Sequence, residues 1–187
     1  ADNNIVAEGY SGATALGVAA ENGMPGILNQ YTWMDSFLGF IPGSVGETSV
    51  IAIGIGLIIL LVTKVASYRI ILGTLAGMIF MSSLLNIVGS DTNPMFYVPW
   101  YWHAVIGSFA FGLVFMATEP VSGSGTNAGR WIYGIVIGIT VILIRVINPA
   151  FPEGMMLAIL FANLLAPVID HMVVMSNIKR RRALINE

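Results

Sequence analysis

Long runs of sequence without charged residues constrain this chain more than any other feature. Only 10% of its 187 residues are charged and 56% are hydrophobic, whereas about 25% of residues are charged in soluble domains. A helix needs about 20 mostly apolar residues to cross the hydrocarbon layer of a bilayer. Five runs meet this description, at residues 48–66, 70–89, 100–118, 131–147 and 154–177. We therefore predict an all-α integral membrane protein with about five spanning helices.

The basic residues predict how these spans are oriented. No Lys or Arg occurs in residues 1–63, and the tail contains the run Lys179-Arg180-Arg181-Arg182. Loops on the cytoplasmic side of a membrane carry an excess of Lys and Arg. With the C-terminus inside, Lys64, Arg69, Arg130 and the tail all face the cytoplasm, which accounts for seven of the eight basic residues. The N-terminus of the segment is then on the outer side.

Three segments follow from this topology. Residues 1–47 are expected on the outer side, residues 48–178 in the membrane and residues 179–187 in a basic cytoplasmic tail. Within the first segment, residues 27–42 are apolar but too short to span, which favours a short interfacial or re-entrant helix. The basic tail is typical of a topology anchor against anionic lipid, and it does not predict a nucleic-acid site.

The lack of cysteine restricts the chemistry that this chain can carry out. The chain has no cysteine, which excludes thiolate metal ligands, iron–sulfur ligation and disulfides within it. Any redox activity therefore needs an added organic cofactor.

The chain begins at Ala1, and residues 1–25 lack the basic flank and apolar stretch of a secretory signal. We expect it to be a segment of a longer protein.

The outer stretch Glu8-Gly9-Tyr10-Ser11-Gly12-Ala13-Thr14 is the most informative motif. Two glycines and small residues indicate a flexible loop that another molecule can approach closely, with a threonine hydroxyl available. An ordinary surface loop would have the same composition, so the residues alone leave both interpretations open.

This stretch resembles the flavin-attachment motif of the Na⁺-translocating NADH:quinone oxidoreductase family, Asp-Gly-x-Ser-Gly-Ala-Thr. Glu8 stands where the family has Asp. The resemblance implies FMN joined through its phosphate to the hydroxyl of Thr14, with Ser11, Gly12 and Ala13 beside it. A flavin transferase makes this bond outside the cytoplasmic membrane in that family.

The resemblance extends along the whole chain, which is similar to the C-terminal half of that family's B subunit. It includes polar loops that similarity among apolar helices would not reproduce, at residues 36–49, 89–96 and 148–156. The chain also resembles, more distantly, the D subunit of the ferredoxin:NAD⁺ oxidoreductase. The resemblance implies one five-helix repeat of a urea-transporter-like fold, located in the bacterial inner membrane.

The family's electron route implies the partners. These are the other subunits of the oxidoreductase complex, including a second subunit with covalent FMN, then a noncovalent riboflavin, ubiquinone, Na⁺ and membrane lipid. The riboflavin contacts cannot be assigned to residues. Two other classes remain open, a channel or transporter of the same fold with unmodified Thr14, and an assembly subunit without a cofactor.

The segment from Gly43 to Ser49 is a second candidate for binding the flavin phosphate. It includes Ser44, Gly46 and Thr48 at the outer start of the first predicted span, where free N–H groups and the positive end of the helix dipole favour an anion. The alternative is an ordinary helix start, in which Ser44 is the cap and Glu47 completes a capping box.

Three charged residues in or near the spans are further candidates. Arg145 lies toward the outer end of the fourth span, where it either stabilises the flavin phosphate and reduced flavin or extends to the interface. Asp170, three residues after Pro167, could lie on a Na⁺ path or hydrogen-bond a neighbouring helix. Glu119 is a weaker Na⁺ candidate, since a capping or loop role is the simpler interpretation there.

Overall fold

The computed structural model describes residues 14–44, 46–90, 92–148 and 153–185, and within these ranges the chain is helical with no strand. The all-α prediction is confirmed. Three helices, α4 (Tyr68–Val88), α7 (Asn127–Ile147) and α8 (Met155–Ile185), are long and apolar enough to cross a membrane. The 21 residues of α4 extend about 32 Å, close to the thickness of the hydrocarbon layer. The chain is a membrane protein, and the second, fourth and fifth predicted spans are present.

The first predicted span is shorter than expected. Instead of residues 48–66, the helix α3 comprises Val50–Val62, and its 13 residues reach only about 20 Å. It ends because the chain turns at Lys64, whose φ of +59° lies in the left-handed region. The turn is closed by hydrogen bonds from the N–H groups of Val65 and Ala66 to the carbonyl of Leu60.

The third predicted span, residues 100–118, is not one continuous helix. It is divided into α5 (Trp100–Val105), α6 (Phe109–Phe111) and the π-helical turn η2 (Gly112–Met116). The break lies at Gly107, which has a φ of +69°. Of the five predicted spans, three are long helices, one is the shorter apolar helix α3 and one is broken. The apolar composition alone did not distinguish a broken helix from a straight one.

The N-terminal segment is more helical than predicted. The helix α1 (Ala15–Gln30) begins well before the short helix predicted for residues 27–42, and α2 (Trp33–Leu38) follows it within that range. Leu16, Ala19 and Ile27 of α1 are fully buried in the hydrophobic core. A kink at Gly23 lets α1 pass close to Pro94 at the start of the 3₁₀ turn η1 (Pro94–Tyr97). This burial of apolar side chains explains why a short segment of moderate helix propensity is helical.

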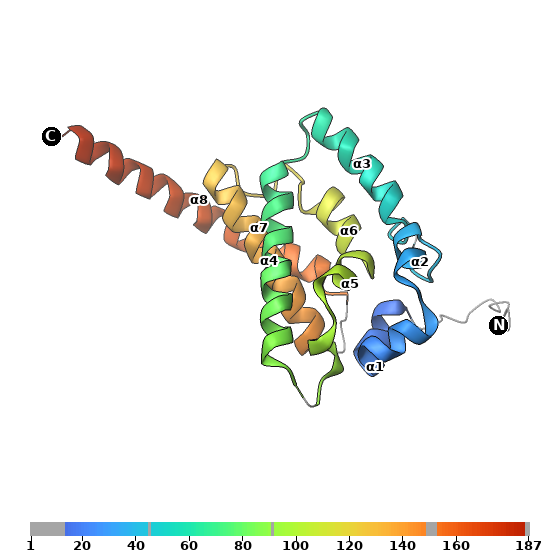
Figure 1. Ribbon diagram of the computed structural model, residues 1–187. Helices are drawn as coiled ribbons and strands as arrows, with labels where there is room; N and C mark the ends of the chain where they lie inside the picture. The colour runs from blue at the N-terminus through green and yellow to red at the C-terminus, as the bar shows by residue number, and fades with distance from the viewer. Residues whose placement is uncertain (1–13, 45, 91, 149–152, 186–187) are drawn as a thin grey trace.

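Helices α4 and α7 pack in parallel through glycines (Figure 1). The backbone of Gly73 and Gly77 on α4 faces that of Gly134 and Gly138 on α7, and a Cβ at Gly77 would collide with the carbonyl of Ile135. Small residues let the backbones of membrane helices approach closely. This parallel pair is the centre of the molecule.

Helix α8 runs antiparallel to α7. Gly154, directly before its first residue, lies beside Val141 and Ile144 near the end of α7, while Asp170 contacts the loop just before α7. The starts of α4 and α7 and the C-terminal part of α8 are therefore at one end of the bundle. This end carries Lys64, Arg69, Arg130 and the basic run of α8, and α1 lies toward the other end (Figure 1).

Candidate functional site

Thr14 is the N-cap of α1. Its backbone is extended, with φ −69° and ψ 154°, and its side-chain oxygen accepts a hydrogen bond of 3.2 Å from the N–H of Gly17. The residue is exposed. The candidate attachment hydroxyl therefore lies on the surface at the positive end of a helix dipole.

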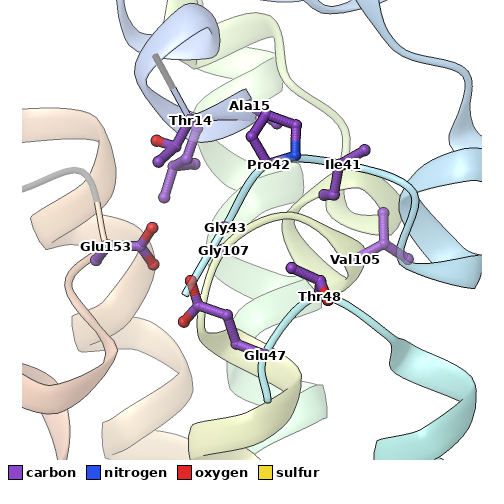
Figure 2. Close-up of a pocket in the computed structure, with 11 residues that line it drawn as sticks. Thr14, Ala15, Ile41, Pro42, Gly43, Glu47, Thr48, Val105, Gly107 and Glu153 are labelled. Atoms are coloured by element: carbon purple, nitrogen blue, oxygen red, sulfur yellow. The ribbon is translucent and has the colours of Figure 1, made fainter. Parts of the chain in front are cut away.

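A small recess begins at this hydroxyl and joins four segments of the chain (Figure 2). The start of α1 forms one wall, the loop between α2 and α3 forms the second, the break after α5 forms the third and the start of the segment before α8 forms the fourth. The lining residues are Thr14, Ala15, Leu16, Ile41, Pro42, Gly43, Glu47, Thr48, Val105, Gly107 and Glu153. Three predicted site residues, Thr14, Gly43 and Thr48, are thus brought together.

The other two residues of the predicted phosphate loop, Ser44 and Gly46, do not line the recess. The N–H of Ser44 donates a hydrogen bond of 2.9 Å to the carboxylate of Glu47. One of the N–H groups that we expected to bind an anion therefore already donates its hydrogen bond to a carboxylate of the protein, that of Glu47. The helix-start interpretation is also corrected, because the N-cap of α3 is Ser49, which accepts from the N–H of Ala52 at 3.4 Å.

Glu153 is a site residue to which the sequence analysis assigned no role. One of its carboxylate oxygens accepts two hydrogen bonds of 2.8 Å from Ser108, one from the N–H and one from the hydroxyl. The two residues are 45 positions apart in sequence. No local motif links them, and the one sequence signal was an acidic residue in the polar loop at residues 148–156.

Arg145 is fully buried and does not extend to the interface. Its guanidinium donates three hydrogen bonds to backbone carbonyls, to His103 at 2.8 Å, to Glu153 at 3.2 Å and to Ile106 at 3.3 Å. The first and last of these carbonyls belong to the end of α5, where the helix break leaves acceptors without intrahelical donors. Arg145 and Glu153 together supply partners for the carbonyls of His103 and Ile106 and for the N–H of Ser108 at the break.

The charge around the recess is mainly acidic at its surface. Figure 2 shows the carboxylates of Glu47 and Glu153 on two walls of the recess, with Thr14 at its edge. The side chains of Glu153 and Arg145 both lie close to Gly107. A Cβ built on Gly107 would be 2.6 Å from Glu153 Oε2 and 3.2 Å from Arg145 Nη2. A phosphate on Thr14 would therefore be most favourable on the α1 side of the recess and away from the two carboxylates.

The candidate Na⁺ residues lie at the opposite end of the bundle. The carboxylate of Asp170 accepts four hydrogen bonds from the loop before α7, between 2.6 and 3.1 Å, from the hydroxyls of Ser124 and Thr126 and the N–H groups of Gly125 and Thr126. These contacts are of the kind expected from the second interpretation, hydrogen bonding to a neighbouring segment. The Na⁺ role of Asp170 stays a prediction.

Glu119 is held within its own turn. Its carboxylate accepts hydrogen bonds from the hydroxyl and N–H of Ser122 and from the N–H of Val121. The hydroxyl of Ser122, and then these N–H groups, lower the pKa of the Glu119 carboxyl. In the part of the chain that the structure describes, no group of three or more His, Cys, Asp or Glu side chains could hold a metal ion.

The remaining residues of the predicted flavin motif lie outside the described residues. They are Glu8, Gly9, Tyr10, Ser11, Gly12 and Ala13. The described part of the motif is its last residue, Thr14, where the hydroxyl is located.

Comparison of the sequence with known proteins identifies the family of this chain. The sequence model of the NQR2, RnfD, RnfE family matches residues 3–179. Over 94% of its length the chain is 63% identical to the B subunit of the Na(+)-translocating NADH-quinone reductase of Ectopseudomonas mendocina, and it is 62% identical to the protein of the same name from Azotobacter vinelandii. It spans about 44% of the length of these relatives. The chain belongs to the NQR2, RnfD, RnfE family.

Proposed function

We propose that this chain is the flavin-bearing part of the B subunit of a Na⁺-translocating NADH:quinone reductase, with FMN attached to Thr14 by a phosphoester bond. The observation that carries the proposal is an exposed Thr14 hydroxyl at the N-terminus of α1, in a chain about 60% identical to proteins of that name. In this proposal the chain passes electrons toward riboflavin and ubiquinone, coupled to Na⁺ translocation.

The residues around Thr14 fit a phosphoester. Its oxygen is at the N-cap position, next to the first turn of α1, where helix N–H groups have no intrahelical partner. Negatively charged phosphate is stabilised at such a helix end. Glu47 and Glu153 line the recess on the other side of Thr14, so their charge favours a phosphate that lies toward α1.

The flavin supplies the redox chemistry when it is bound, and the protein supplies position and electrostatics. The recess walls come from α1, the loop before α3, the α5 break and Glu153. Arg145 holds the break with three hydrogen bonds, so the wall at Gly107 is rigid. In our proposal this rigidity keeps the attachment point at a constant distance from the next carrier in the complex.

The location of the site supports the proposed orientation in the bacterial inner membrane. Thr14 and Glu153 are at the end of the bundle opposite Lys64 and Arg130. An excess of basic residues marks the cytoplasmic side, so Thr14 faces the periplasm, where the flavin transferase acts in the family that the motif resembles.

Flavin fluorescence on a denaturing gel tests the proposal. The full-length protein that contains this segment is expressed with the flavin transferase, as parent, as Thr14→Val and as Thr48→Val. Thr48 is the matched control because it lines the same recess with the same side chain. We expect a fluorescent band in the parent and in Thr48→Val, and none in Thr14→Val. A dark parent band with an active transferase would contradict covalent attachment and favour a channel or an assembly role.

A further inference from the structure

A polar cavity of about 180 Å³ lies at the end of the bundle opposite Thr14. It is enclosed by the turn between α3 and α4, the loop before α7 and the start of α7. Its polar side chains are Lys64, Ser67, Thr118, Glu119, Ser124 and Arg130. The proposed flavin function uses none of them.

Two cations line this cavity from separate parts of the chain. Lys64 is in the turn that ends α3, and Arg130 is in the first turn of α7. The Nε of Arg130 donates to the carbonyl of Ser124 at 3.2 Å, but neither cation forms an ion pair among the described residues. Lys64 also has a φ of +59°, a conformation that is costly for a residue with a Cβ and is concentrated at functional sites.

Ser67 provides a separate observation that indicates a missing acceptor. It is the N-cap of α4, a helix of 21 residues, but its side chain makes no capping hydrogen bond. Its hydroxyl oxygen is buried and has no partner in the described structure. Buried hydroxyls are normally hydrogen-bonded. A bound acceptor in the cavity would satisfy this group and would also lie at the positive end of the α4 dipole.

Glu119 is the one carboxylate among the lining residues. It forms no ion pair with either cation, and its three hydrogen bonds are all with Val121 and Ser122 in its own turn. The lining has two positive side chains, Lys64 and Arg130, and one negative side chain, Glu119, so its formal net charge is +1. The cavity is therefore suited to a single negative charge with several acceptor oxygens.

We propose that this cavity binds a phosphate group, held by Lys64, Arg130 and the hydroxyl of Ser67. The phosphate belongs either to an anionic phospholipid such as phosphatidylglycerol or to free inorganic phosphate. The cavity is at the end of a membrane-spanning helix, where lipid headgroups are located. Beside it Tyr68 is half exposed and stacks under Arg69 at 4.7 Å, as is common for aromatic residues at the interface.

Native mass spectrometry of the detergent-purified complex tests this site. The purified complex, which contains the full-length form of this subunit, is titrated with phosphatidylglycerol and with phosphatidylcholine, with and without inorganic phosphate. The variants are Lys64→Gln combined with Arg130→Gln, and Ser67→Ala, which leaves the charge unchanged. Lys179→Gln combined with Arg180→Gln is the matched control, since these exposed cations are on the same side but outside the cavity.

We expect the double cavity variant to lose about tenfold or more in phosphatidylglycerol affinity, because two charge-assisted contacts are removed. Ser67→Ala should lose about threefold to tenfold, and the tail control should lose less than about twofold. Ser67→Ala retains the test if the double variant does not fold. If inorganic phosphate displaces the lipid, or stabilises the parent but not the cavity variants, the site accepts the free anion as well. Equal binding by the parent and the cavity variants, or an equal loss in the tail control, would overturn the proposal.

Discussion

At the scale of single residues, Thr14 combines two roles that can be separated. Its hydroxyl caps α1, and in our proposal the same oxygen bonds to the flavin phosphate. Esterification removes the proton but keeps an oxygen at the N-cap, so the cap need not be lost when the flavin is attached. The phosphate would instead add negative charge at the positive end of the helix.

The capping role predicts an effect without flavin. In protein made without the transferase, Thr14→Ala should destabilise the start of α1 by about 1 kcal/mol, whereas Thr14→Ser should be nearly neutral. Amide hydrogen exchange at residues 15–22 measures this directly. Equal protection in the parent and Thr14→Ala would show that the bond from Gly17 does not stabilise α1.

Asp170 is the second residue whose role the contacts address. It accepts four hydrogen bonds, so Asp170→Asn should lower stability by about 3 kcal/mol through the loss of charge-assisted bonds. We expect the drop in melting temperature to be the same in Na⁺ and in K⁺ salts. Glu21→Gln, at an exposed position of α1 to which no role is assigned, is the control. A larger drop in Na⁺ would support a Na⁺ path at Asp170.

At the scale of elements, the broken third span is the feature that makes the recess. A transmembrane helix can be interrupted where protein groups satisfy the freed backbone. Arg145 supplies donors to the carbonyls of His103 and Ile106, and Glu153 supplies an acceptor for the N–H of Ser108. Both partners come from other elements, so the break depends on how α7 and α8 pack.

Arg145→Lys tests this dependence. An ammonium cannot reproduce a planar fork that reaches three carbonyls, so we expect a loss of about 3 kcal/mol and faster hydrogen exchange at residues 105–111. Arg130→Lys is the matched control, because Arg130 donates to the carbonyl of Ser124 at 3.2 Å and is partly exposed. Similar melting temperatures for the two variants would contradict the role assigned to Arg145.

The contact between α4 and α7 predicts which glycines tolerate a methyl group. Gly77→Ala would push Cβ against the Ile135 carbonyl and should cost about 1–3 kcal/mol through overpacking. Gly54→Ala on α3 is the matched control, since a Cβ there has no atom within 4 Å, and it should be neutral or stabilising by up to about 1 kcal/mol. Thermal unfolding in detergent compares the two. A tolerated Gly77→Ala would show that the helices can separate at low cost.

At the scale of the whole molecule, the bundle has two chemically different ends. One end holds Thr14, Glu47 and Glu153. The other end holds Lys64 and Arg130, which line the polar cavity that we propose binds phosphate. In our proposal the first faces the periplasm and the second the cytoplasm. This segment has no cysteine, so a single cysteine introduced here is its only thiol, and the protein without the new cysteine gives the labelling background.

Thr92→Cys and Val121→Cys are suitable reporters. Both positions are exposed, before η1 and in the loop before α7 respectively. In intact spheroplasts a membrane-impermeant maleimide should label Thr92→Cys, and it should label Val121→Cys only after permeabilisation. The opposite pattern would reverse the proposed orientation.

The sequence by itself determined that this protein belongs in a membrane, included the three long helices among its five predicted spans and gave the charge difference between its ends, because length, hydropathy and charge act locally. It also singled out Thr14 as the candidate attachment residue, since a covalent attachment motif is contiguous. Only the tertiary structure decided that the third span is broken, that Arg145 is buried and that Glu153 joins the recess. These features depend on hydrogen bonds between residues about 40 positions apart, which form only when α5, α7 and α8 pack together, and no local pattern records that packing.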